Sequence, residues 1–167
     1  MKVYGLTKDF VPTRETYSQV IVSYDMVAEP DGKHATWHEV YFNVKQTGRP
    51  SFEQIKDAVI ADINRQTDEK ILTGFMWNDI PVWLSTEYQH NFSEAQRRAQ
   101  LRPDSLPVTF KLGEDADKNP IYYTFETLTD INTFYDQAYR FVDQCLHEGW
   151  RRKDSINWND YRQDENA

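Results

Sequence analysis

The segment from Lys70 to Ala99 constrains the fold of this chain more than any other part of it. It begins with two short apolar runs that are rich in aromatic residues, and Asn78 and Asp79 separate the runs. Asn and Asp tolerate the left-handed backbone that a tight hairpin turn requires. The pattern therefore predicts a β-hairpin with strands at 70–77 and 80–84.

The hairpin is followed at once by a helix signal. Pro81 cannot donate a hydrogen bond to a neighbouring strand, so the second strand is expected at the edge of a sheet. Thr86 and Gln89 have the spacing of a capping box, in which two side chains satisfy the free amides of a helix start. A helix is therefore expected over 86–100.

The rest of the chain repeats this alternation of strands and helices. Ser51 and Gln54 form a second capping box, and Thr127 with Asp130 predicts the start of the longest helix, which Gly149 is expected to end. Apolar residues recur at helical spacing after both signals. The remaining predicted elements are strands at 17–27, 34–46, 108–112 and 120–125, a helix at 52–66, a long helix from 128, and a short helix within 150–161.

These elements predict an α+β fold. Antiparallel β-hairpins alternate with three helices in the order ββα-ββα-ββα, and the helices are expected to pack on one face of a sheet. The predicted organisation is an N-terminal arm or short edge strand over 1–16, a single domain over 17–161 and a frayed tail over 162–167.

Charge and composition narrow the classes of partner. The net charge is −8, which argues against binding to a phosphate backbone. The basic run from Arg151 to Lys153 is better explained by the negative end of a helix dipole. No apolar run is long enough to cross a membrane, and the first residues lack the apolar core of a signal peptide. Cys145 is the only cysteine, so an intrachain disulfide is excluded.

The sequence nominates no catalytic or metal-binding residue. His34 and His38 share one face of a predicted strand but lie about 13 Å apart along it, at about 3.3 Å per residue. His90 and His147 have no His or Cys neighbour at zinc-ligand spacing. Nucleophile and phosphate-binding motifs are missing. We therefore expect no cofactor.

One loop has a partial calcium-binding pattern. Asp115, Asp117 and Asn119 occupy the first ligand positions of an EF-hand loop, and Glu126 falls at its closing position. Pro120 replaces the glycine that the loop turn needs, and its fixed negative φ cannot substitute for one. A polar hairpin loop is the favoured interpretation, and residual calcium affinity is left open.

Aromatic residues are more numerous than one core needs, which hints at a contact surface. Core packing remains the first interpretation for each of them taken singly. The candidate contact or fold-defining residues are Trp77, Trp83, Tyr88, Gln89, Asn91 and Tyr123.

Four segments together resemble a known family. They are G-F-M-W-N-D-I-P-V-W-L-S-T-E-Y-Q-H-N-F, L-P-V-T-F-K-L-G, Y-Y-T-F-E-T-L-T-D and C-L-H-E-G-W-R-R-K-D-S-I-N-W. The order and sequence of these segments resemble a domain of unknown function found in phages and prophages. Related domains accompany tail-fibre and tail-assembly proteins. The resemblance covers about residues 55–158 and carries no established active site.

The resemblance implies a virion structural or tail-assembly protein that acts through protein–protein contacts without catalysis. Its expected partners are other virion or assembly proteins in a homo- or hetero-oligomer, with no nucleic acid and no membrane insertion. The expected location is the host cytoplasm during assembly, with the virion as a further location. Two alternatives stay open: a carbohydrate- or small-ligand-binding module, and a hydrolase with a distal pair of carboxylates.

Overall fold

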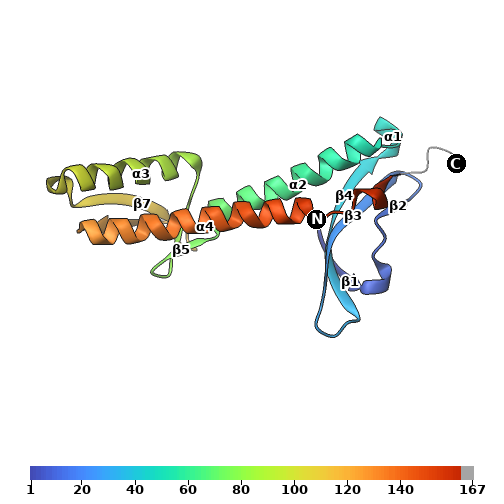
Figure 1. Ribbon diagram of the computed structural model, residues 1–167, viewed down its shortest axis with the longest axis horizontal. Coiled ribbons are helices and arrows are strands. Elements are labelled where there is room, and N and C mark those ends of the chain that lie inside the picture. The colour runs from blue at the N-terminus through green and yellow to red at the C-terminus, as the bar shows by residue number, and fades with distance from the viewer. Residues whose placement is uncertain (163–167) are drawn as a thin grey trace. The chain divides into compact units, whose positions relative to one another are not determined.

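The computed structural model describes residues 1–162. The frayed tail predicted over 162–167 lies outside the described residues except for Arg162. Figure 1 labels the α-helices and most of the strands. The elements are β1 (Lys2–Leu6), η1 (Thr7–Asp9), β2 (Thr13–Glu15), β3 (Gln19–Ala28), β4 (His34–Asn43), α1 (Val44–Thr47), α2 (Phe52–Thr73), β5 (Phe75–Trp77), β6 (Ile80–Val82), α3 (Thr86–Leu101), η2 (Pro103–Ser105), β7 (Val108–Glu114), β8 (Pro120–Phe125), α4 (Leu128–Asp154) and η3 (Trp158–Tyr161).

The described chain divides into two compact units. Among the described residues, unit 1 consists of 1–64 and 150–162, and unit 2 consists of 65–149. The boundaries fall inside α2 and α4, so no linker marks them in the sequence. Each unit buries its own apolar cluster, which explains why the division exists.

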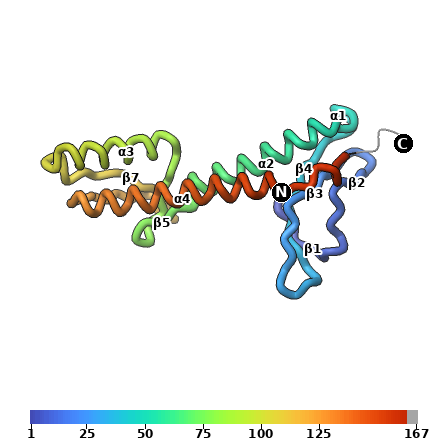
Figure 2. The backbone as a smooth tube through the Cα atoms, in the orientation of Figure 1, coloured from blue at the N-terminus to red at the C-terminus, as the bar shows by residue number. Residues whose placement is uncertain are grey.

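Unit 1 is built on a four-stranded antiparallel sheet with the strand order β1-β4-β3-β2. Its centre is the predicted β3–β4 hairpin, which Figure 2 shows as one continuous trace. Asp31 holds the hairpin turn by accepting hydrogen bonds from the amides of Lys33 and His34, at 2.8 and 2.9 Å. The first residues, predicted as an arm or short edge strand, form both edge strands, β1 and β2.

One face of this sheet packs against the first part of α2. Alternate residues of β3 point to this face and meet a stripe of α2 side chains spaced by four residues. The residues after α4 return to this core, because the Tyr161 hydroxyl donates a 2.9 Å hydrogen bond to the carbonyl of Ser23. The buried members of this core are Val20, Val22, Tyr24, Ile55, Val59, Ile63 and Tyr161.

The opposite face of the sheet buries a carboxylate. The Glu39 side chain is 1% exposed, and it accepts hydrogen bonds from Arg14, Ser23, Trp37 and Tyr41. Arg14 and Trp37 approach to 2.9 and 3.0 Å. A charge can be buried in this way only because several donors replace the water that it loses.

Unit 2 contains two separate hairpins, β5–β6 and β7–β8, together with α3 and the adjoining parts of α2 and α4. The predicted Asn78-Asp79 turn is confirmed, with φ values of +48° and +64°. The amide of Trp83 donates to the carbonyl of Leu112 at 2.8 Å and fastens the two hairpins to each other. The buried core of unit 2 is Ile71, Phe75, Trp77, Val82, Leu84, Phe92, Ala99, Leu112, Phe125, Ile131, Phe134, Ala138 and Cys145.

Helix α2 continues to Thr73, past the predicted end at Gln66. Thr67 and Ile71 extend the four-residue spacing of Ile63, and all three are buried. The strand predicted over 70–77 is therefore limited to β5.

Helix α4 is also longer than predicted. Gly149 was expected to end it, yet the helix runs on to Asp154. A Cβ atom at Gly149 would lie 2.6 Å from the Thr67 hydroxyl oxygen, so the glycine serves a close approach of two helices. The predicted short helix within 150–161 becomes the last turns of α4 followed by η3.

The predicted α+β class is confirmed, with antiparallel sheets alternating with helices. The strict order ββα-ββα-ββα is not confirmed, because two more strands precede β3 and the short helix α1 follows β4. The prediction that the helices cover one face of a single sheet was wrong, because the strands of residues 1–162 form three separate sheets. None of the helices within residues 1–162 is both long and apolar enough to cross a membrane.

Candidate anion-binding groove beside helix α3

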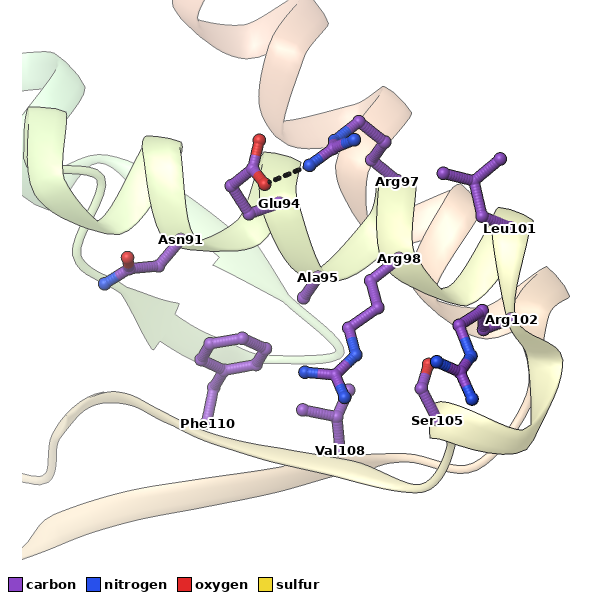
Figure 3. Close-up of a pocket in the computed structure, with 10 residues that line it drawn as sticks. All are labelled: Asn91, Glu94, Ala95, Arg97, Arg98, Leu101, Arg102, Ser105, Val108 and Phe110. Atoms are coloured by element: carbon purple, nitrogen blue, oxygen red, sulfur yellow. Dashed lines mark hydrogen bonds and ion pairs between the residues drawn. The ribbon is translucent and has the colours of Figure 1, made fainter.

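A groove of about 570 Å³ lies between α3 and the start of β7 in unit 2 (Figure 3). This volume is within the usual range for ligand sites, about 300–1,000 Å³. Three of its side chains are arginines and one is a glutamate. The lining residues are Asn91, Glu94, Ala95, Arg97, Arg98, Leu101, Arg102, Ser105, Val108 and Phe110.

The start and packing of α3 fix which side chains reach the groove. The helix begins at Thr86, as predicted, but its cap is Ser85 and not the predicted pair of Thr86 and Gln89. The Ser85 side chain accepts a hydrogen bond from the amide of Tyr88 at 3.3 Å. Phe92 and Ala99 are buried in the core of unit 2 and hold one face of α3 inward. Arg98 and Arg102, one turn apart, are left on the side that borders the groove.

Arg98 is the central cation of the groove. In Figure 3 its side chain extends from α3 toward β7, and its guanidinium group ends beside Val108. Within residues 1–162, the Arg98 guanidinium has no hydrogen-bond or ion-pair partner. Its donors are therefore free to bind an anion.

Arg102 places a second guanidinium beside Ser105 at the end of the groove (Figure 3). Its one acidic neighbour among the described residues is Asp104, at 3.7 Å, and both side chains are more than 70% exposed. Such an ion pair contributes little, because water and salt screen it. Arg102 can therefore turn to a ligand at small cost.

Arg97 differs from these two arginines. It is paired with Glu94 at 2.7 Å, and this pair lies on the α3 side of the groove, where Figure 3 marks it with a dashed line. The Arg97 guanidinium lowers the pKa of Glu94, so this carboxylate stays ionised. The groove thus has one neutralised pair and two available cations.

The floor of the groove is apolar. Ala95, Val108 and Phe110 are partly buried and face the space under the arginines. Phe110 is fixed by edge-to-face contacts with Phe92 and Phe125, with ring centroids 5.0 and 6.3 Å apart. An apolar floor beneath guanidinium groups suits a ligand that carries both an anionic and an apolar group.

The charged groups of the groove are mainly hydrogen-bond donors. Guanidinium groups stay protonated at all accessible pH values and present a planar fork of donors that matches a carboxylate or phosphate. The one carboxylate in the lining, Glu94, is already paired. Among residues 1–162, no three His, Cys, Asp or Glu side chains come together as metal ligands.

Of the candidate contact residues predicted from the sequence, one lines the groove and the others lie elsewhere in unit 2. Asn91 lines the groove, and Tyr88 packs edge-to-face on Phe92 at 5.8 Å behind it. The amide nitrogen of Gln89 donates to the carbonyl of Leu84 at 2.7 Å, which strengthens the start of α3.

Three further candidates are positioned away from the groove lining. Trp77 is 5% exposed and stacks edge-to-face on Phe134, and Tyr123 contacts Trp77 and donates weakly to Asp130 at 3.3 Å. Trp83 is partly buried, and the Lys111 ammonium group lies 5.1 Å from its ring centre.

The cationic residues of the groove were missed in the sequence. Only the run from Arg151 to Lys153 was read as basic, and those residues do lie in the last turn of α4. The available signal was the four-residue spacing of Arg98 and Arg102 on a predicted helix, which places both on one face. The contribution of Val108 and Phe110 could not be read, because it depends on how β7 packs against α3.

The loop with the partial calcium pattern is a hairpin turn. Asp115 accepts hydrogen bonds from the amides of Asp117 and Asn119 at 2.9 and 2.8 Å, and these bonds lower its pKa together with the Asn119 side chain. Pro120 starts β8, as predicted. The carboxylate of Asp115 is thus occupied in shaping the turn.

Unit 1 holds a second cluster of ionisable groups. Arg152 is paired with Asp25 at 2.7 Å, and the Tyr24 hydroxyl donates to Asp62 at 2.5 Å. His38 lies against Tyr24, with ring centroids 5.7 Å apart. Burial, and then the charge of Arg152, lower the pKa of His38.

The structure is thus that of a small α+β protein with a cationic groove beside α3. Residues 54–167 match the family described as a domain of unknown function, DUF4376, and the chain belongs to this family. The matched segment contains all of unit 2 and therefore the whole groove. No curated protein and no solved structure matches the chain.

Proposed function

We propose that this protein acts by contact rather than by catalysis, and that the groove beside α3 binds an acidic, partly apolar segment of a protein partner. The observation that carries this proposal is the pair of available guanidinium groups, Arg98 and Arg102, above the apolar floor formed by Val108 and Phe110.

A carboxylate suits the guanidinium groups because two parallel hydrogen bonds can form with each of them. A neighbouring aliphatic or aromatic side chain of the partner suits the floor, where it would leave water. Arginine is also the cation that binding surfaces use most, since its fork is planar and weakly hydrated.

A protein partner is favoured over nucleic acid by the charge of the whole chain. A net charge of −8 repels a phosphate backbone, and two available arginines are few for a polyanion. A short acidic segment needs only the local positive charge of the groove. Repulsion from acidic residues farther away than a Debye length, about 8 Å, is largely screened by salt.

The biological setting that we propose is a phage particle. The resemblance to a domain found in phages and prophages supports a virion structural or tail-assembly component that contacts other assembly proteins in the host cytoplasm. Mass spectrometry of purified virions and assembly intermediates tests this setting, and the protein is expected in at least one of them. Its absence from both would refute the setting.

The binding proposal is tested with a short synthetic peptide that carries two glutamates beside a leucine and a fluorescent label. We expect saturable binding by fluorescence anisotropy that weakens as salt is added. Arg98→Glu should weaken binding by about tenfold or more, because it removes a charge-assisted hydrogen bond and adds repulsion.

Arg140→Glu is the matched control, since Arg140 is an exposed arginine of unit 2 outside the groove lining. It changes the net charge equally and should leave binding nearly unchanged. Equal loss in both variants would show that only overall charge matters and would contradict the groove. Tighter binding of single-stranded DNA than of the peptide would replace the protein partner with nucleic acid.

A further inference from the structure

The β7–β8 hairpin borders the cationic groove at one end and has an acidic turn at the other. Val108, at the start of β7, lines the cationic groove, and Glu114 ends the strand where the turn begins. Since β7 has seven residues, at about 3.4 Å each, its ends are about 20 Å apart. The groove and the turn therefore cannot meet within one copy of unit 2.

The turn at the far end is acidic and well defined. Asp115 holds its shape with hydrogen bonds to the amides of Asp117 and Asn119. The side chain of Asp117 is exposed and has no partner among the described residues. Lys118 partly offsets this charge, and Glu114 is paired with Lys111 at 2.8 Å. Asp117 is thus the available carboxylate of the turn.

The two surfaces complement each other. The groove offers the unpaired guanidinium of Arg98 and the weakly paired one of Arg102, and the turn offers the unpaired carboxylate of Asp117 on a rigid tip. Ala116 beside it is small enough to approach the apolar floor. A tip that is already ordered loses little conformational entropy on binding.

We infer that the acidic turn of one copy of this chain occupies the groove beside α3 of a second copy, an inference that rests on the proposed binding function of the groove. In a pair joined in this way, the copy that supplies the turn keeps an unused groove, and the copy that supplies the groove keeps an unused turn. Such a contact is heterologous, so copies add head to tail and form a ring or a filament.

The test uses two variants of the full chain and sedimentation velocity. The groove variant is Arg98→Glu with Arg102→Glu, and the turn variant is Asp117→Lys, which keeps the backbone hydrogen bonds of the turn. The wild-type chain should show an average mass that rises with protein concentration and falls as salt is added. Each variant alone should remain a monomer, and Arg140→Glu should assemble like the wild type.

An equimolar mixture of the two variants decides the geometry. One variant keeps only a working turn and the other only a working groove, so the mixture should form a one-to-one dimer that does not grow further. Larger assemblies in the mixture, or variants that assemble like the wild type, would overturn the inference.

The outcome is separable from that of the proposed function. A wild-type chain that stays monomeric at every concentration, yet binds the acidic peptide through Arg98, would overturn the second copy as occupant and leave the groove as a site for another protein. Failure of both assembly and peptide binding would overturn both proposals. Circular dichroism of each variant shows whether it is folded.

Discussion

At the scale of single residues, Glu39 shows how a charge is retained in the interior. Burial alone would raise the pKa of this carboxyl, but the hydrogen bonds from Tyr41 and Trp37 and the charge of Arg14 outweigh it, so the pKa is lowered. On a strand over 34–46, Glu39 and Trp37 lie on the same face because side chains alternate, yet the sequence does not show that this face is closed to water. Whether water reaches Glu39 depends on where the residues before Gln19, such as Arg14, pack on this face.

Glu39→Gln should lower the free energy of unfolding by about 2 kcal/mol, because charge-assisted hydrogen bonds become neutral and the new amide faces donors. The loss should be seen above pH 4.5, the ordinary pKa of this group, and should shrink as pH falls through the lower pKa of the folded state. Urea unfolding followed by circular dichroism at a series of pH values measures it.

The control for this prediction is Glu53→Gln at the exposed start of α2, which should change stability little at any pH. A Glu39→Gln protein as stable as the wild type at neutral pH would show that the donors around Glu39 find equally good partners elsewhere.

His38 gives a pH dependence of the same sign as Glu39, but at higher pH. Burial and then the charge of Arg152 lower its pKa below 6.5, despite the attraction of Asp25 and Asp62. The unfolded chain therefore binds the proton more readily, and stability should be full above pH 6.5 and should fall as pH drops below that value.

Replacing His38 with phenylalanine should flatten the stability profile just below pH 6.5, since that side chain cannot take a proton. The exposed His90→Gln variant should keep the wild-type slope. A steeper profile for His38→Phe would contradict the assignment, and NMR titration of the His38 ring would measure its pKa directly.

At the scale of elements, helix starts could be predicted from the sequence and helix ends could not. Ser51 and Gln54 form the expected reciprocal hydrogen bonds, and the amide of Asp130 donates to the Thr127 hydroxyl as predicted. These caps are local and use only side chains within one turn. Helix ends depend on packing, which is why Gly149 was misread as a stop.

Gly149→Ala tests the close approach of α4 to α2 within unit 2. The added methyl group would clash with Thr67, and we expect a loss of about 1–3 kcal/mol despite the better helix propensity of alanine. Calorimetry or urea unfolding measures the loss.

A second substitution shows whether the clash is the cause. Thr67→Ala removes Oγ1 and Cγ2, the two atoms that would lie closest to the new methyl group, so the double variant should be more stable than additivity predicts. Strictly additive losses would indicate that Gly149 is needed for its backbone and not for the space beside Thr67.

At the scale of the whole molecule, the α+β class was accessible from the alternation of hairpins and helices, but the division into two units was not. The sequence has no linker, because the boundaries lie inside α2 and α4. The groove was inaccessible for a related reason: α3 and β7 are neighbours in the chain, yet which of their side chains share a surface depends on the packing of Phe92 and Phe110.

The two cores predict two regions of local stability. Ile55→Ala, in the core of unit 1, should cost about 3 kcal/mol and should speed hydrogen exchange in β3 and β4. Exchange in β7 and β8, which belong to the other core, should change much less. Hydrogen exchange with mass spectrometry resolves these strands, and an equal acceleration in both would indicate a single cooperative unit.

The family match begins at residue 54, inside α2, and this boundary cuts through the core of unit 1. A fragment expressed from that point would retain Ile55, Val59 and Ile63 but would lose the strand residues Val20 and Val22 that cover them. Its first helix would then present a bare apolar stripe to water, which favours aggregation. Unit 2, by contrast, is one uninterrupted stretch of chain, so gene fragments for this family are best cut with β1–β4 included and unit 2 left whole.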